Sequence, residues 1–150
     1  MISILAKSAD DLDFQELVTL LDAELAITDG DDHDFYHQFN GSEKLSHVVV
    51  AYDEESNPVA CGALRPFDEN SVELKRMFVR KEFRGRGAAF QILCYLEVLV
   101  KNLGFQRCLL ETGVRQLPAI KLYERNGFTR IPGYGPYLGV EGSICMEKMV

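Results

Sequence analysis

The residues best suited to chemistry are the glycines and arginines near the middle of the chain. Arg84, Gly85, Arg86 and Gly87 follow an apolar stretch, and two alanines at 88–89 come directly after them. Glycine lets a backbone approach a phosphate group closely, and the unsatisfied N–H groups at the start of a helix carry a partial positive charge. Arginine adds charge that pairs well with a pyrophosphate. The segment therefore predicts a phosphate-binding turn that opens a helix.

Two common phosphate-binding motifs do not describe this turn. The chain has no GxxxxGK[ST] sequence, so a Walker loop is excluded. Phe90 stands where the GxGxxG fingerprint of dinucleotide-binding domains needs its third glycine. We therefore expect a phosphate-binding turn of a different kind.

The net charge of −7 hides an uneven distribution along the chain. Residues 8–43 contain eleven acidic side chains and no lysine or arginine. Residues 75–86 contain six basic side chains and one acidic one, which gives this window a charge of +5. A net negative charge is not typical of a general nucleic-acid binder or of a protein that docks on anionic membranes. A local basic window instead indicates a small anionic ligand.

The turn must be positioned by a strand before it and a helix after it. The 150 residues suit one domain, so we expect a single α/β domain over residues 1–150. Apolar periodicity predicts strands over residues 2–7, 48–52, 59–64, 71–79, 108–111, 128–131 and 143–149. It predicts helices over residues 12–25, 34–39, 88–103 and 118–126. On the strand before the turn, alternation of side chains places Val72, Leu74, Arg76 and Phe78 on one face.

The spacing Arg84-x-x-Gly87-x-Ala89 resembles the pyrophosphate-binding motif of the GNAT superfamily, the acetyl-CoA-dependent N-acetyltransferases. Residues 119–128 resemble the later helix of that family, with its Tyr-Glu-x-x-Gly-Phe ending. The departure is Ala89, where many members have glycine. The resemblance covers essentially the whole chain. It implies the GNAT fold: a mixed, mostly antiparallel sheet of about seven strands, splayed at its centre, with about four helices.

The resemblance also implies a co-substrate, acetyl-CoA, whose acetyl group passes directly to a primary amine. It assigns the pyrophosphate to residues Arg84, Gly85, Arg86, Gly87, Ala88 and Ala89. It assigns the pantetheine arm, and the negative charge that develops on the thioester oxygen, to the backbone of Met77, Phe78 and Val79.

An alkylamine has a pKa of about 10.4, so it must lose a proton before it can attack a thioester. By resemblance, Glu73 is the general base, acting directly or through water. Its neighbours Val72 and Leu74 predict partial burial, which raises the pKa of a carboxyl group. Glu111, at the end of the next strand, is a second candidate base. The resemblance places Tyr123 beside the thioester sulfur, where it hydrogen-bonds the departing thiolate.

The resemblance places the acceptor pocket at the first helices and at the loop before the last strand. These segments carry acidic and tyrosine side chains that suit a cationic amine, namely Asp29, Asp31, Asp32, Tyr134 and Tyr137. We therefore expect a small cationic metabolite as acceptor, such as a polyamine or a basic amino acid. Two other functions stay open: a non-catalytic module that binds CoA or acyl-CoA, and an acetyltransferase of protein lysines or N-termini.

Composition sets the remaining expectations. The four cysteines lie singly among apolar residues, so we expect reduced core cysteines and a cytoplasmic protein. No stretch approaches the roughly 20 apolar residues of a membrane span, and the N-terminus lacks the basic region of a signal peptide. The acidic and histidine residues of segment 29–40 lack EF-hand spacing, so we expect no metal. The resemblance also makes a homodimer compatible with this chain, because family members are often dimers.

Overall fold

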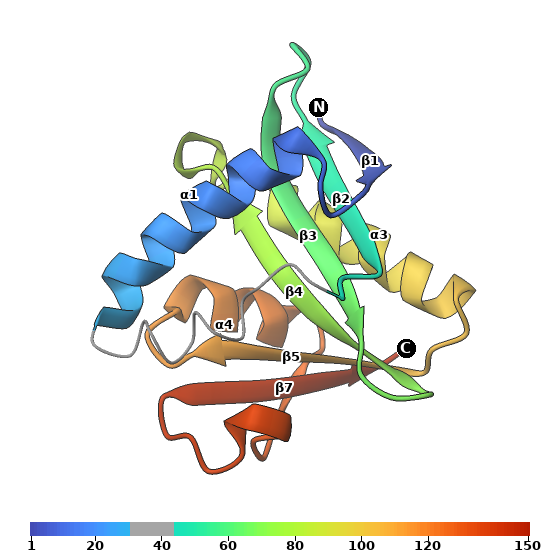
Figure 1. Cartoon of the computed structure of the whole chain (residues 1–150), viewed down its shortest axis with the longest axis vertical. Helices are drawn as coiled ribbons and strands as arrows, with labels where there is room; N and C mark the ends of the chain where they lie inside the picture. Colours follow the sequence, from blue (N-terminus) through green and yellow to red (C-terminus); the bar gives the residue numbers. More distant parts are fainter. Residues whose placement is uncertain (31–43) are drawn as a thin grey trace.

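A single mixed sheet forms the centre of the protein (Figure 1). The structure is a computed structural model that describes residues 1–30 and 44–150. The strands are β1 (Ser3–Lys7), β2 (His47–Tyr52), β3 (Pro58–Pro66), β4 (Ser71–Val79), β5 (Arg107–Gly113), β6 (Thr129–Ile131) and β7 (Ser143–Met149). Their order across the sheet is β1-β2-β3-β4-β5-β7-β6, which confirms the expected seven-stranded mixed sheet.

Three α-helices lie within the described residues, against about four expected. They are α1 (Leu12–Asp29), α3 (Ala88–Asn102) and α4 (Leu117–Arg125), and two short 3-10 helices are η2 (Lys81–Phe83) and η3 (Gly135–Tyr137). The expected helix 34–39 lies outside the described residues, as do the proposed acceptor residues Asp31 and Asp32.

Helix α1 is one turn longer than its apolar pattern predicts. It begins after Asp11, whose carboxylate accepts a hydrogen bond from the backbone N–H of Phe14 at 3.0 Å and so caps the helix. The prediction ended it at residue 25 because an acidic, turn-rich stretch follows. The Thr28 hydroxyl instead donates to the carbonyl of Glu24, one turn back, and the helix ends before Gly30, whose φ is 57°. This extra turn carries Asp29 into the body of the protein.

The helices divide the core into two apolar clusters, one on each face of the sheet. Helices α3 and α4 supply Ile92, Leu96 and Tyr123 to the larger cluster. Helix α1 supplies Phe14 and Leu17 to the smaller one. All of these side chains are at most 6% exposed, so both faces of the central strands are covered.

Strands β4 and β5 separate soon after they meet. They pair in parallel over three residues each, 71–73 with 107–109, and then diverge. Every other pairing in the sheet is antiparallel, and that of β5 with β7 covers all seven residues of β5. The predicted splay at the centre of the sheet is therefore present, and Figure 1 shows β4 turning away from β5, with α4 drawn between their diverging ends.

A β-bulge in β4 changes which residues face α1. Cys61 pairs with Phe78 and Ala63 pairs with Lys75, so Arg76 and Met77 both stand opposite Gly62. Arg76 has a φ of 58°, in the left-handed region. The prediction of strict alternation is therefore wrong beyond Lys75, because the extra residue inverts the pattern.

After the bulge, Met77 and Val79 pack in the larger cluster, on the side of α3. Phe78 packs in the smaller cluster, beneath α1. A Cβ at Gly62 would lie 2.7 Å from the sulfur of Met77 and 2.9 Å from a methyl carbon of Ile92, so a larger residue opposite the bulge would force these side chains to shift.

Ion pairs fasten α1 to the basic window of residues 75–86. The guanidinium of Arg76 lies 2.9 Å from the carboxylate of Asp22, and that of Arg84 lies 2.7 Å from that of Glu24. A third pair joins Arg80 to Glu16. Three acidic side chains of α1 therefore pair with three arginines of the basic window.

These pairs differ in burial, which makes a matched test possible. The Arg76 side chain is 2% exposed, so Asp22→Asn leaves a buried cation without its counter-charge and should lower the free energy of unfolding by about 2 kcal/mol. Glu16 is 57% exposed, so Glu16→Gln should cost less than about 1 kcal/mol. Urea denaturation of both variants measures the two values. Equal losses would show that burial of the Arg76 pair has no special weight.

Candidate active site

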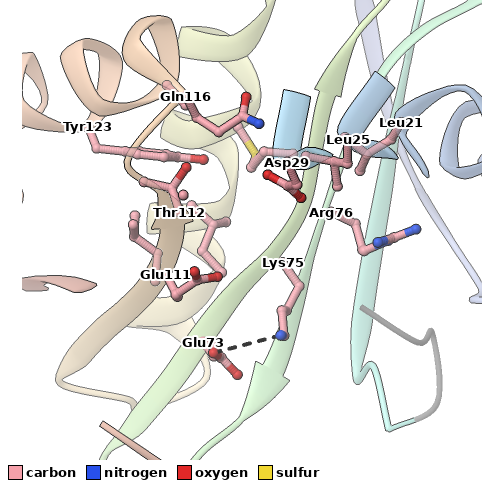
Figure 2. A pocket seen from close by; sticks show the side chains of 15 residues that line it. Leu21, Leu25, Asp29, Glu73, Lys75, Arg76, Glu111, Thr112, Gln116 and Tyr123 are labelled. Atoms are coloured by element: carbon pink, nitrogen blue, oxygen red, sulfur yellow. Dashed lines mark ion pairs between the residues drawn. The ribbon is translucent and has the colours of Figure 1, made fainter. Parts of the chain in front are cut away.

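A pocket of about 130 Å³ lies where β4 and β5 diverge, between α1 and α4 (Figure 2). Its polar lining includes Asp29, Glu73, Lys75, Glu111, Gln116 and Tyr123. Four of these were expected from the sequence as catalytic or acceptor residues, and the fold brings them together from α1, β4, β5 and α4.

Tyr123 reaches the pocket from α4. Pro118 lies in the first turn of this helix, and the Tyr123 ring packs edge-on against Phe128 with centroids 5.7 Å apart. Figure 2 shows the hydroxyl pointing toward Thr112 on β5. Burial raises the pKa of Tyr123, so its phenol keeps its proton and serves as a hydrogen-bond donor.

Glu111 lies on β5, beyond the last pair that β5 forms with β4. The hydroxyl of Ser143, on β7, donates a hydrogen bond to its carboxylate at 2.7 Å. Burial raises the pKa of Glu111 to about 7, and the charges of Glu73 and Asp29 act in the same direction. The hydrogen bond from Ser143 and the charge of Lys75 oppose this rise. A carboxyl group that titrates near neutral pH is suited to general base catalysis.

Glu73 occupies the end of the pocket away from Tyr123, as Figure 2 shows. Its side chain is 6% exposed, and one carboxylate oxygen lies 3.8 Å from the ammonium group of Lys75. The same oxygen accepts a hydrogen bond from the Tyr134 hydroxyl at 2.7 Å. Burial lowers the pKa of Lys75, while Glu73 opposes that fall. Glu73 is thus held by two partners.

Asp29 enters the pocket because α1 has its extra turn. It is 5% exposed, and its backbone carbonyl accepts a hydrogen bond from Arg115. A Cβ at Gly113 would stand 3.5 Å from a carboxylate oxygen of Asp29, which shows how closely α1 approaches the end of β5.

The two tyrosines predicted to bind the acceptor, Tyr134 and Tyr137, are held by neighbouring side chains. The Tyr134 hydroxyl donates a hydrogen bond to Glu73. Tyr137 is 2% exposed, and its ring is edge-on to that of Tyr134. Neither lines the pocket formed by the described residues.

Sequence reasoning missed three polar residues of the pocket, Lys75, Arg76 and Gln116. Lys75 could have been found from its spacing, because it lies two residues after Glu73 and hence on the same face of β4. The side-chain nitrogen of Gln116 is buried without a hydrogen-bond partner. Gln116 immediately precedes α4, and no signal in the sequence singles it out.

Both glycines of the turn have a left-handed backbone and open space around them. Gly85 and Gly87 have φ values of 82° and 81°, and a Cβ built on either would meet nothing within 4 Å. Gly87 stands directly before α3, so the first N–H groups of that helix open onto this space.

The arginines of the turn differ in their surroundings. Arg84 pairs with Glu24 and lies over the ring of Phe78, whereas Arg86 lies over Phe83 at 4.6 Å. Arg86 forms no ion pair with any other described residue. Of the two arginines predicted to bind a pyrophosphate, Arg84 is therefore already paired with α1.

A family model described as the acetyltransferase (GNAT) family matches residues 14–128, which is most of the chain and includes the glycine turn, Glu73, Glu111 and Tyr123. The chain belongs to the GNAT family.

Two curated relatives illustrate the range of similarity within GNAT proteins. A protein named IAA acetyltransferase, from Azospirillum brasilense, is 38% identical over 91 residues, which are 60% of this chain and 60% of that protein. The uncharacterized N-acetyltransferase YsnE, from Bacillus subtilis, is 30% identical over 93% of this chain and 95% of its own. The match thus spans less than two thirds of the first relative and nearly all of the second.

Solved structures share the fold over the whole chain. A Klebsiella pneumoniae protein, provisionally named an acyl-CoA N-acyltransferase, superposes with a TM-score of 0.85 at 27% identity, covering 99% of this chain and 97% of that one. A GNAT acetyltransferase from Elizabethkingia anophelis, solved with acetyl-CoA bound, gives a TM-score of 0.69 at 18% identity and covers 99% and 98% of the two chains. At that identity the second likeness concerns the fold alone.

Within residues 1–30 and 44–150, no helix is long and apolar enough to cross a membrane. Across the same residues, no group of three or more His, Cys, Asp or Glu side chains is placed to hold a metal ion.

The raised pKa of Glu111 makes stability depend on pH in a defined direction. The folded protein binds this proton more tightly than the unfolded chain, so the contribution of Glu111 to stability is full below about pH 4.5 and is lost as pH rises through about 7. Glu111→Gln replaces the titrating carboxyl group with a neutral amide, so the variant does not lose this stability as the pH rises. Relative to wild type, the free energy of unfolding of the variant should therefore rise by about 3 kcal/mol between pH 4.5 and pH 8.

Urea denaturation across this pH range measures the difference between the two proteins. A difference that stays constant with pH would show that Glu111 titrates at its ordinary value in the folded protein.

Proposed function

We propose that this protein is an N-acetyltransferase that moves the acetyl group of acetyl-CoA directly to the primary amine of a small cationic molecule. Membership of the GNAT family makes it an acyltransferase with acetyl-CoA as its co-substrate. The observation that carries the assignment to an amine is the pocket at the splay. There a carboxyl group with a pKa of about 7 and a protonated, buried phenol share one cavity.

The chain's own residues fit acetyl-CoA at two places. The open space at Gly85 and Gly87, in front of the first N–H groups of α3, accepts the pyrophosphate. The edge of β4 that faces β5 has no strand partner from Leu74 onward, so its backbone N–H groups there are available to the pantetheine amides and the thioester oxygen. Acetyl-CoA supplies the acetyl group as a thioester, which makes the carbonyl carbon open to attack by an amine.

Glu111 is the proposed general base, in preference to Glu73. It accepts the proton that the amine loses, while the nitrogen forms its bond to the acetyl carbon. A carboxylate with a pKa of about 7 accepts a proton far more readily than one at the ordinary value of 4.5. Glu73 supports this assignment because its carboxylate is already held by Lys75 and Tyr134.

Tyr123 is the proposed hydrogen-bond donor to the departing thiolate. Its phenol has a raised pKa, and a phenol is ordinarily a weaker acid than a thiol by about 1.5 units. Complete proton transfer to sulfur is therefore uphill. Donation of a hydrogen bond, with late proton transfer, is the role that fits this chemistry.

Three carboxylates in a small pocket favour a small cationic acceptor over a protein substrate. The charges of Asp29 and Glu73 both raise the pKa of Glu111, so an ammonium group placed among the three relieves their mutual repulsion. A cavity of about 130 Å³ has room for a thioester and a short amine. A non-catalytic CoA-binding module has no need of a near-neutral carboxyl group beside a buried phenol.

Glu111→Gln should lower kcat/KM by 100-fold or more with the best amine of a panel, which is the usual range for loss of a general base. Glu73→Gln should lower kcat/KM much less. Thiol release from acetyl-CoA measures both variants against wild type. The reverse order would make Glu73 the base. No thiol release with any amine, together with thermal stabilisation by CoA, would indicate the binding module.

A matched pair of glycine variants tests the pyrophosphate site. Gly87→Val and Gly104→Val both place a branched side chain at a positive φ, 81° and 88°, with nothing within 4 Å. Both should strain the backbone, but Gly104 follows the far end of α3. Calorimetric titration with CoA should show at least tenfold weaker binding to Gly87→Val and little change with Gly104→Val. Equal affinities would place the pyrophosphate elsewhere.

A further inference from the structure

Two polar side chains meet at the end of β5, one from α1 and one from the turn before α4. A Cβ built on Gly113 would stand 3.5 Å from a carboxylate oxygen of Asp29 and 3.8 Å from the Cγ of Gln116. Asp29 is the last residue of α1, and Gln116 immediately precedes α4. Figure 2 shows both at the Tyr123 end of the pocket, with the amide nitrogen of Gln116 turned toward Asp29. A carboxylate and an amide therefore flank one point of the pocket wall.

The backbone of Gln116 is fixed on both sides. Its N–H donates to the carbonyl of Gly113 at 3.0 Å, and its carbonyl accepts from the N–H of Ile120, in the first turn of α4, at 3.0 Å. The N–H of Val114 donates to the carbonyl of Gly142, just before β7, at 3.0 Å. The side-chain amide is thus carried by a turn that is tied to β5, to α4 and to the chain before β7.

The amide nitrogen of Gln116 is buried, and it has no hydrogen-bond partner among the residues that the structure describes. A buried N–H group without a partner is destabilising, so folded proteins keep few of them. Gln116 lines the pocket of about 130 Å³, so its amide lies where a bound molecule has access to it. The nitrogen therefore marks a place for an oxygen atom of a bound molecule.

A ligand that suits both side chains carries a hydrogen-bond donor and an oxygen acceptor close together. The carboxylate of Asp29 accepts hydrogen bonds from an amine, and the amide nitrogen of Gln116 donates to an oxygen. In an α-amino acid or its amide, the amine nitrogen and the carbonyl oxygen are attached to neighbouring carbon atoms. A polyamine has no oxygen, so it would leave the Gln116 nitrogen buried and unpaired.

The charges of the pocket lining also suit such a molecule. The cations Lys75 and Arg76 line the same pocket as the carboxylates of Asp29, Glu73 and Glu111. A carboxylate on the acceptor thus meets cations as well as carboxylates, and its ammonium group is attracted by the carboxylates. The lining is therefore compatible with an amine that carries either a carboxylate or a neutral carbonyl group beside it.

We propose that Gln116 is a specificity-determining residue, which together with Asp29 selects acceptors that carry an α-amino carbonyl group. The acceptor is then a small amino acid or its amide, and not a polyamine. The inference rests on the proposed function, because it takes this pocket as the place where the amine meets the thioester. It chooses between the two kinds of acceptor that the sequence left open.

The test compares three acceptors for each amino acid of a panel: the free acid, its amide, and the amine that lacks the carboxyl group. Lysine, lysinamide and cadaverine form one such set, in which cadaverine is a diamine without oxygen. Thiol release from acetyl-CoA gives kcat/KM for each acceptor. With the best set, the acid or the amide should exceed the amine by at least about tenfold, because a site built to hydrogen-bond an oxygen rejects the analogue that lacks it.

Gln116→Leu removes the donor while keeping a side chain of similar size. The ratio of kcat/KM between the preferred acceptor and the amine without oxygen should fall by about tenfold or more. Comparing this ratio between the two proteins cancels the different basicities of the amines. Leucine leaves no N–H group unpaired, so thermal denaturation should show a variant at least as stable as wild type.

Gln116→Glu is a second variant, which replaces the donor with an anion of the same shape. It should lower kcat/KM more for the free acid than for the amide, because the added charge repels a carboxylate. Gln106→Leu is the matched control. Gln106 is exposed and immediately precedes β5, at the opposite end of that strand from Gly113, so this variant should keep the wild-type ratio.

An unchanged ratio in Gln116→Leu would overturn the inference, and so would a wild-type preference for the amines without oxygen. A raised KM for acetyl-CoA with the ratio unchanged would also overturn it and assign Gln116 to the pantetheine arm. Failure of the proposed function has a different signature: no amine of the panel then releases thiol, or Glu111→Gln keeps the activity of wild type, and the inference fails with it.

Discussion

The divergence of β4 from β5 is the constraint on which the rest of the structure depends. The strands pair over only three residues, after which the edge of β4 is open. The bulge opposite Gly62 turns Arg76 toward α1 and returns Met77 and Val79 to the core. A continuous parallel ladder would fill the space that the pocket occupies. The same divergence leaves the edge of β4 beyond Glu73 without a strand partner and separates the strands that carry Glu73 and Glu111.

Charge organises the site around that opening. The arginines of the basic window pair with Glu16, Asp22 and Glu24 of α1, so they fasten the helix that brings Asp29 into the pocket. Three of the acidic residues of α1 therefore hold the helix in place. In the proposed function, the acceptor amine meets the group of carboxylates inside the pocket, where low exposure strengthens each interaction. Glu111 has a near-neutral pKa because burial and two neighbouring carboxylates act together.

Much of this could be predicted from the sequence, because local patterns carry it. The bounds of β4, the start of α3 and the glycine turn follow from apolar periodicity and from residue types that suit one conformation. The bulge was not predicted, although an isolated glycine within a strand, here Gly62, is the usual signal of a bulge. The bond between Tyr134 and Glu73 joins positions 61 residues apart, and the burial that tunes Glu111 exists only in the folded protein. No pattern along the chain encodes either of them.

The central claim is that the splayed strands create a carboxyl group poised near neutral pH at Glu111. The most direct measurement is a ¹³C NMR titration of the glutamate side-chain carboxyl carbons, with the Glu111 signal assigned by its absence in Glu111→Gln. The account predicts a midpoint near pH 7 for that signal. A midpoint near 4.5, the ordinary value for glutamate, would contradict it.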